Sequence, residues 1–355
     1  MRHSSGVHPD RQPPPGHRPR PAPRPWHEAW QDALYGGGGF YRSHAPAQHF
    51  HTSAQGIPGG GRLLAEALVV LCRRHGLGGV LDVGAGRGEL LAEVRRLAPD
   101  LHLHGVDVVD RPPGLPVDRW TRSPGGPTLP DGLADLRSVL VVAHEWLDVV
   151  PCPVLARDEE GVWRELAVRE DGTEEQGPPA WGEDLAWADR GLGPRVRRAE
   201  VGRARDLAAA DLVGRVHEGL VLLVDYGHLA TDRPTGGTLT GYRDGRQVHP
   251  VPDGTADLTA HVAWDSVVGH LGPPARLTTQ RHALLEVLGG DDPAAPVPHA
   301  LARTDPAAYL ALLARRAALG ALTAPGGLGD FGWVLVPVRA GDDGRARPDD
   351  GPVPG

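Results

Sequence analysis

Residues 79–89 have the sequence Gly-Val-Leu-Asp-Val-Gly-Ala-Gly-Arg-Gly-Glu. The apolar residues before position 84 are typical of a short buried strand, and glycine follows at positions 84, 86 and 88. Leucine or valine then recurs at helical spacing, at positions 90, 91, 94 and 97. The pattern predicts a strand, a glycine-rich turn and a helix. Such a turn lets a ligand approach the backbone closely, and the start of the helix offers it unpaired N–H groups.

The spacing of Gly84, Gly86 and Gly88 discriminates between nucleotide-like ligands. A dinucleotide fingerprint, Gly-x-Gly-x-x-Gly, needs a third glycine at the position of Glu89, which disfavours a nicotinamide dehydrogenase. The chain instead has Asp-x-Gly-x-Gly-x-Gly starting at Asp82, which resembles motif I of the class I methyltransferases that bind S-adenosylmethionine. This cofactor carries an ammonium group and no phosphate, so the resemblance makes Asp82 a candidate cofactor-binding residue. An ordinary glycine-rich turn is the alternative interpretation.

The composition excludes several classes of protein. The chain has 355 residues, of which 40% are hydrophobic, and this is enough to build a core. Its formal net charge is −8, so no global basic field indicates nucleic-acid binding. The two cysteines, Cys72 and Cys152, form no C-x-x-C pattern that would indicate a disulfide framework or a zinc site. The sequence shows neither the ~20-residue apolar run of a membrane helix nor a secretory signal core, so we expect a cytoplasmic protein.

The order of the predicted elements indicates an α/β fold. We expect a Rossmann-like, doubly wound, mostly parallel sheet of the class I methyltransferase type. Predicted strands cover residues 80–83, 101–107, 139–143, 219–224, 276–278 and 331–338, and predicted helices cover 26–35, 62–75, 90–97, 280–288 and 306–319. One domain spans residues 26–338 in this interpretation, between a Pro- and Arg-rich tail over 1–25 and a polar tail over 339–355. Both tails are expected to be disordered.

Residues 152–218 are expected to form an insertion that covers the active site. Residues 154–170 have the pattern of a β-hairpin, residues 171–182 are acidic and turn-rich, and residues 183–218 carry a mixed helical pattern. Elsewhere, residues 111–135 are rich in proline and glycine and are predicted to be mostly loop. Asp257 or Thr259 is predicted to cap a helix that continues to Val268.

Polar residues follow three of the predicted strands. Asp107 ends the second strand about 20 residues after the glycine turn, where doubly wound folds place an acidic residue that binds the ribose of an adenosine ligand. Asp110 is the second candidate for this role. Glu145 and Asp148 follow the apolar strand 139–143, at the sheet edge where ligands bind. Two carboxylates there suit a cationic substrate such as a guanidinium, although they could instead cap the next helix.

The tip of the strand over residues 219–224 carries Asp225, Tyr226 and His228 toward the same edge. His228 could act as a general base, and a structural histidine is an equally reasonable interpretation. Three further histidines lie close together in one loop, at positions 44, 49 and 51. Since histidine is frequent in this chain, we interpret these three as incidental and predict no metal site.

Several stretches together resemble the MidA-like family of S-adenosylmethionine-dependent methyltransferases, found in bacteria and mitochondria. They are the glycine turn, Ala143–Pro151, Val224–Gly227, Gly237–Leu239 and Ala256–Val262, and the resemblance spans roughly residues 36–338. Phe40-Tyr41 and Thr52-Ser53 are similar to the N-terminal signature of that family in shortened form. The mitochondrial member is an assembly factor for respiratory complex I that dimethylates an arginine. The resemblance therefore implies protein arginine N-methylation, with S-adenosyl-L-methionine as cofactor and possible homodimerisation.

The resemblance also implies roles for single residues. Gly84, Gly86 and Gly88 would wrap the cofactor, and Asp107 would hold its ribose. Glu145 and Asp148 fall on the family's Asn-Glu-x-x-Asp segment, with His144 where asparagine is usual, and Asp82 stands where the family often has glutamate. The position of these residues at strand tips, and not the resemblance, leads to the remaining expectations. Glu145 would contact both the cofactor and the substrate guanidinium, and Asp148 would bind the guanidinium. Asp225 or His228 would accept the proton.

Two other functions are compatible with the same residues. The chain could be a non-catalytic assembly factor, a chaperone-like binder on the same fold. It could also be a small-molecule methyltransferase that acts on an amine or a hydroxyl group. The intact Asp82, glycine turn and Glu145 favour an enzyme over the non-catalytic alternative.

Overall fold

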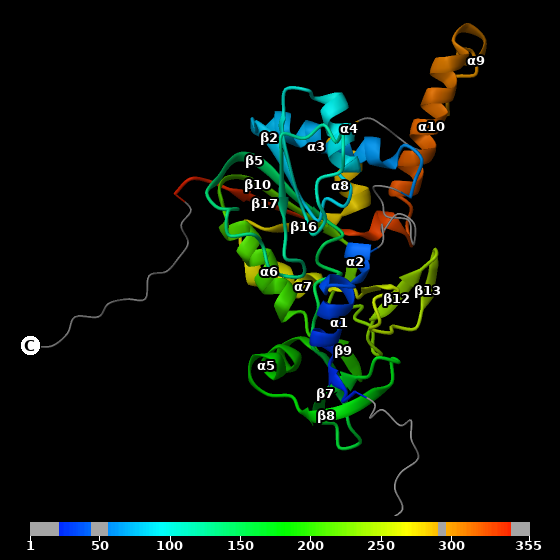
Figure 1. Cartoon of the computed structure of the whole chain (residues 1–355). Coiled ribbons are helices and arrows are strands. Elements are labelled where there is room, and N and C mark those ends of the chain that lie inside the picture. Colours follow the sequence, from blue (N-terminus) through cyan, green and yellow to red (C-terminus); the bar gives the residue numbers. More distant parts are fainter. Residues whose placement is uncertain (1–20, 44–55, 290–295, 342–355) are drawn as a thin grey trace, which may run out of the picture.

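The computed structural model describes residues 21–43, 56–289 and 296–341, and a seven-stranded sheet lies at its centre (Figure 1). The strand order is β16-β17-β10-β5-β2-β3-β4. The strands are β2 (Gly79–Val83), β3 (His102–Asp107), β4 (Arg119–Arg122), β5 (Leu136–His144), β10 (Val216–Asp225), β16 (Arg276–Thr279) and β17 (Gly332–Val338). Only β17 runs antiparallel to its neighbours in this sheet. The predicted Rossmann-like, mostly parallel sheet is thus confirmed.

Helices cover both faces of this sheet (Figure 1). Helices α3 (Gly60–His75), α4 (Glu89–Leu97), α8 (Gln280–Leu288) and α10 (Pro306–Leu322) share a core with Val80, Leu140 and Leu220. Helices α6 (Arg203–Gly214) and α7 (Trp264–Leu271) share a core with Leu81, Val141 and Val221. Because side chains alternate along a strand, neighbouring residues serve the two cores. A sheet covered on both faces requires strands as apolar as β5 and β10.

The register of the parallel strands aligns their carboxyl ends. Val83 is paired with Val106 and with Ala143, and His144 is paired with Val224. The glycine turn after β2, the end of β3 and the segments after β5 and β10 therefore meet at one edge of the sheet. This is the edge at which doubly wound folds bind their ligands.

A second sheet packs against the N-terminal helix α1 (Trp26–Tyr35). It consists of β1 (Arg24–Pro25), β6 (Val154–Arg157), β7 (Trp163–Val168), β8 (Glu174–Pro179) and β9 (Arg198–Glu200), and α5 (Gly182–Gly191) lies beside it in Figure 1. The pairing of β6 with β7 confirms the predicted hairpin. Trp26, Trp30 and Leu34 are each 0% exposed, which explains the helical spacing of large apolar residues in α1.

Smaller elements complete the described part of the chain. They are α2 (Phe40–Ser43), β11 (Gly227–His228), β12 (Thr240–Arg243), β13 (Arg246–Val248), β14 (Asp257–Thr259), β15 (Val262–Ala263), α9 (Leu301–Thr304) and a 3₁₀ turn (Leu328–Asp330). Strands β12, β13 and β14 form one small sheet, and β11 pairs with β15.

Three local predictions differ from the structure. Residues 111–135 are mostly loop, as predicted, apart from the edge strand β4, but the turn-rich stretch 171–182 contains β8. Asp257 and Thr259 lie in β14 and cap no helix, because Asp257 accepts a hydrogen bond from Tyr41 and Thr259 donates one to Asp148. Arg24 and Pro25, predicted to be disordered, pair with β7. Residues 1–20 and 342–355 of the predicted tails lie outside the described residues.

Candidate functional site

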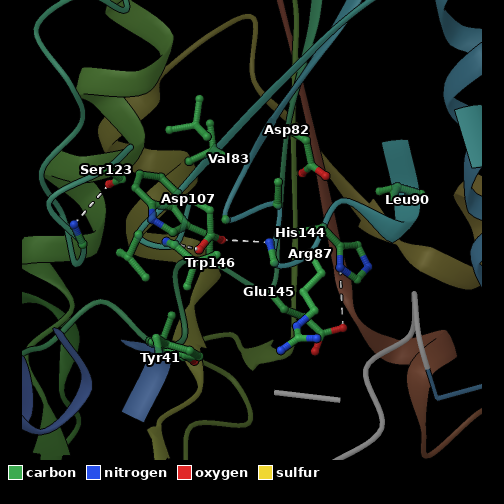
Figure 2. A pocket seen from close by; sticks show the side chains of 18 of the residues that line it. Tyr41, Asp82, Val83, Arg87, Leu90, Asp107, Ser123, His144, Glu145 and Trp146 are labelled. Atoms are coloured by element: carbon green, nitrogen blue, oxygen red, sulfur yellow. Dashed lines mark hydrogen bonds and ion pairs between the residues drawn. The ribbon is translucent and has the colours of Figure 1, made fainter. Parts of the chain in front are cut away.

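A cavity of about 610 Å³ lies at the carboxyl edge of β2, β3 and β5 (Figure 2). Its wall comes from the glycine turn, the ends of β3 and β5, and the N-terminal helices. The lining residues are Tyr35, Tyr41, Arg42, 82–87, Glu89, Leu90, 106–113, Ser123, Gly125, Gly126, 144–146, Asp148 and Val149. None of the residues 152–218 appears in this lining, so the described part of the predicted insertion does not form the cavity wall. Helix α6, within that stretch, instead packs on the central sheet.

The three glycines of the turn have left-handed backbone conformations. Their φ angles are +75° at Gly84, +59° at Gly86 and +79° at Gly88, a region that residues with a Cβ rarely adopt. Gly84 and Gly86 line the cavity, as expected of cofactor-binding residues. Gly88 does not, and a Cβ there would come within 2.5 Å of a methyl group of Leu115. Its absent side chain allows the turn to pack on the loop after β3.

Asp107 connects the end of β3 to the glycine turn. One carboxylate oxygen accepts the N–H of Gly86 at 2.8 Å, and the other accepts the N–H of Val109 at 3.2 Å (Figure 2). Burial raises the pKa of Asp107 to about 6. Each oxygen keeps a lone pair, so the carboxylate can still accept hydrogen bonds from ribose hydroxyls. Asp110 also lines the cavity, but its side chain is 82% exposed and lies 3.4 Å from Arg122.

Asp82 lies beneath the glycine turn at the wall of the cavity. It is 3% exposed, and burial, with the nearby Asp107 and Glu89, raises its pKa to about 8. An approaching cation would reverse this shift by favouring the ionised form. The ammonium group of S-adenosylmethionine carries a positive charge, and no positive charge is among the groups that shift the pKa of Asp82.

Glu145 occupies a strained backbone position directly after β5. Its φ of +53° is unusual for a residue with a side chain, and its N–H donates to the carbonyl of Val224 at 2.8 Å. The Nδ1 atom of His144 lies 3.6 Å from the Glu145 carboxylate, too far for a hydrogen bond. Burial lowers the pKa of His144 to about 4, so this contact is not an ion pair near neutral pH.

Asp148 presents one carboxylate oxygen without a hydrogen-bond partner. Its Oδ2 accepts hydrogen bonds of 2.6 Å from the Tyr226 hydroxyl and of 2.6 Å from the Thr259 hydroxyl. Its Oδ1 is buried and has no hydrogen-bond partner among the described residues. The whole residue is 5% exposed and lines the cavity. Burial raises the pKa of Asp148, and the two hydroxyl hydrogen bonds act in the opposite direction.

The structure does not bring Asp225 and His228 to the cavity wall. The Asp225 carboxylate accepts the N–H of Asp148 at 3.0 Å and the N–H of Tyr226 at 2.9 Å, and the residue is 1% exposed. His228 lies in β11, where its ring centroid is 6.3 Å from that of His261. Burial lowers the pKa of His228 to about 4. Asp225 therefore positions the segment that carries Asp148, and the placement of His228 does not fit a proton acceptor in the cavity.

Arg205 of α6 is a supporting residue that the sequence patterns did not identify. It is 1% exposed, and its guanidinium donates to four backbone carbonyls, those of Asp148, Val150, Ala260 and His261. These bonds hold the segment after β5 against the segment after β14. The signal was present in the sequence as an arginine among the apolar positions of a helix.

Tyr41 and Trp146 also line the cavity and were not proposed as site residues. The hydroxyl of Tyr41 donates to Asp257 at 2.7 Å. Tyr41 falls within the predicted N-terminal signature, so the resemblance contained a signal for it. Thr52 and Ser53 of that signature lie outside the described residues.

The described residues contain neither a candidate metal-binding cluster nor a candidate membrane-spanning helix. No group of three or more His, Cys, Asp or Glu side chains in residues 21–43, 56–289 and 296–341 could hold a metal ion. His44, His49 and His51 lie outside those ranges. Within the same part of the chain, the helices lack the combination of length and apolar character that a membrane span needs.

Known proteins share the fold and part of the sequence. Residues 119–275 match the family described as "Putative S-adenosyl-L-methionine-dependent methyltransferase". A crystal structure of a COG1565 superfamily member from Burkholderia thailandensis, bound to S-adenosyl-homocysteine, is 22% identical, with a TM-score of 0.69. A native structure from the same organism and superfamily is 22% identical, with a TM-score of 0.66. Each comparison covers 88% of this chain and 87% of the other. No curated protein matches this chain in sequence.

Proposed function

Because residues 119–275 match a family of S-adenosyl-L-methionine-dependent methyltransferases, we propose that the chain N-methylates an arginine side chain of a protein. The observation that carries this proposal is that Asp148, whose buried Oδ1 has no hydrogen-bond partner among the described residues, lines the same cavity as the glycine turn. A buried carboxylate oxygen without a partner is costly unless a ligand satisfies it. A cation with N–H donors is the ligand that satisfies both its charge and its lone pairs.

The neighbours of Asp148 favour a guanidinium as that cation. Glu145 lines the same cavity three residues earlier, so the site offers two carboxylates from one short segment. A guanidinium is planar and has five N–H donors, which can bind two carboxylates at once. The aromatic ring of Tyr41 lines the same cavity and can pack on a planar cation.

The two carboxylates would make the substrate nitrogen a better nucleophile. The cofactor supplies an activated methyl group. Glu145 and Asp148 bind the guanidinium and hold its charge away from the nitrogen that is methylated. They also orient that nitrogen, which is the main requirement of the transfer. Methylation releases one proton, which we assign to Glu145, since Asp225 and His228 lie outside the cavity lining.

The other predicted properties stay predictions. They are the homodimer, the cytoplasmic location and the absence of a nucleic-acid partner. The small-molecule methyltransferase and the non-catalytic binder are the functions that compete with arginine methylation, and one experiment separates all three.

We would incubate the purified chain with S-adenosylmethionine and with matched peptides that contain arginine, lysine or citrulline. Mass spectrometry should detect a gain of one or two methyl groups on the arginine peptide alone. Glu145→Gln should lower this methylation about 100-fold or more, because it removes a charge and the proton acceptor. Methylation of amines or hydroxyl compounds from a metabolite mixture would support the small-molecule alternative, and binding of the cofactor without any transfer would support the non-catalytic one.

A further inference from the structure

The cavity wall is mostly acidic, which does not match the carboxylate end of S-adenosylmethionine. Of the described residues that line it, six are carboxylates and three are arginines. The carboxylates are Asp82, Glu89, Asp107, Asp110, Glu145 and Asp148, and the arginines are Arg42, Arg87 and Arg111. S-adenosylmethionine carries a sulfonium and an ammonium group, which suit this wall, and also a carboxylate, which needs a cation. The three arginines are the described lining residues that carry the charge this carboxylate needs.

Two of the three arginines already bind the backbone. The Nε atom of Arg42 donates to the carbonyl of Tyr35 at 2.8 Å. The Nη2 atom of Arg111 donates to the carbonyl of Leu115 at 2.7 Å. Arg111 also follows Asp107 and Asp110 on the loop after β3, which is the ribose side of the cavity.

Arg87 differs from both. It is exposed, and its guanidinium makes no hydrogen bond or ion pair with the rest of the described chain. Its backbone follows Gly86, the residue whose N–H binds Asp107. Figure 2 shows the Arg87 side chain on the side of the cavity occupied by Glu145 and His144, whereas Asp107 and Ser123 lie on the other side. Among the described residues that line the cavity, Arg87 is thus the arginine whose guanidinium has no hydrogen bond or ion pair, and it lies at the end away from the ribose.

We propose that Arg87 binds the α-carboxylate of S-adenosylmethionine. This assignment rests on the proposed function only in its choice of cofactor. A guanidinium can form two parallel hydrogen bonds with a carboxylate, which supplies orientation as well as affinity. With Asp82 at the ammonium group, Arg87 would fix both charged ends of the amino-acid portion. The methyl group would then be held in one position relative to Glu145.

Isothermal titration calorimetry with two ligands tests the assignment. S-adenosylmethionine carries the carboxylate, and its decarboxylated analogue lacks that group and keeps the ammonium, sulfonium and adenosine. Arg87→Leu should weaken binding of S-adenosylmethionine about 10- to 100-fold, because charge-assisted hydrogen bonds are lost. The variant should bind the decarboxylated analogue within about threefold of the wild type. Arg87→Lys, which keeps the charge without the planar fork, should give an intermediate affinity for S-adenosylmethionine.

Arg111→Leu is the matched control, since it removes a cavity arginine on the ribose side. Arg111→Leu should change the affinities for S-adenosylmethionine and for the decarboxylated analogue by the same factor. If Arg87→Leu weakens both ligands equally, or neither, the carboxylate assignment is wrong while the cofactor site stands. If the wild type binds neither ligand, the cofactor itself is wrong, and the proposed function and this assignment both fail.

Discussion

The backbone N–H of Asp148 donates a 3.0 Å hydrogen bond to the carboxylate of Asp225, 77 residues later in the chain. This bond joins the segment after β5 to the tip of β10, which are neighbouring strands of the sheet. Asp225 also accepts the N–H of Tyr226, whose hydroxyl binds Asp148. The two strand ends therefore hold one another in place, and the Asp148 carboxylate is fixed by its own neighbours.

The first prediction follows from this pairing. Asp225→Asn should destabilise the protein by about 1–3 kcal/mol, because an amide N–H₂ would face one of the two N–H donors. It should also lower methyl transfer by displacing Asp148. In an Asp148→Asn background the same substitution should lower the remaining transfer much less, since the residue through which Asp225 acts is already lost. Thermal unfolding and transfer assays on the four proteins of this cycle provide the measurement. Equal effects of Asp225→Asn in both backgrounds would contradict a positioning role.

The second prediction concerns the glycine turn. Gly86→Val should abolish detectable binding of S-adenosylmethionine in calorimetry, because a β-branched residue is strained at a φ of +59° and its side chain would occupy the cavity wall. The matched control is Gly76→Val, at the end of α3, where φ is +65° and an added Cβ meets nothing within 4 Å. This variant should lose comparable stability and keep its affinity for the cofactor. If both variants lose binding, unfolding explains the lost affinity of Gly86→Val, and the prediction for the glycine turn is contradicted.

The third prediction concerns protonation of Asp82. Because its pKa is raised to about 8, this carboxyl is mostly neutral at pH 7 in the free protein. Binding of an ammonium group should ionise it and release up to one proton. Calorimetry in buffers of different ionisation enthalpy should detect this release at pH 7, and the release should diminish above pH 9. Binding of S-adenosylmethionine to the Asp82→Asn variant should release no such proton. Release that is unchanged in Asp82→Asn would assign it to another group.

The raised pKa of Asp82 also has a consequence for stability. The folded pKa lies above the ordinary carboxyl value of 3.8, so the folded state retains a proton that the unfolded state loses. The contribution of Asp82 to stability is therefore fully present below about pH 4 and is lost as the pH rises through about 8. The cofactor should offset this loss, and the stabilisation that it provides should increase over the same range.

The fourth prediction concerns His228. His228→Ala should leave methyl transfer within about threefold of the wild type, because the residue lies outside the cavity lining. A pH–rate profile of the variant should have the same limbs as that of the wild type. A loss of 100-fold or more that an added imidazole restores would instead make His228 the proton acceptor.

Periodicity and glycine spacing were sufficient to predict the central sheet. Buried parallel strands such as β5 and β10 are continuous apolar runs, and amphipathic helices such as α3 have a regular apolar face. β4 and β8 were missed because their residues are mostly polar and show no apolar alternation. Their pairing with β3 and β7 decides that they are strands. Pairing of this kind leaves little trace in local propensity.

The sequence predicted those site residues whose place in the cavity follows from their position after a strand. Asp107, Glu145 and Asp148 reach the cavity because they follow parallel strands. The same rule did not show that Asp225 and His228 lie outside the cavity lining, since it fixes the edge of the sheet and not the direction of a side chain. The hydrogen bonds that turn Asp225 toward the backbone involve residues far apart in sequence, and so do those of Arg205. Patterns along one chain do not reveal such partners.

The measurement that tests the central claim most directly uses S-adenosylmethionine labelled in its methyl group. The chain would be incubated with the labelled cofactor and an arginine-containing protein fraction, which is then hydrolysed to amino acids. We predict label in methylated arginine with the wild type and with Asp110→Asn, and at least 100-fold less with Asp148→Asn. Label in another amino acid or a small molecule, or equal label in arginine with Asp148→Asn, would contradict the account.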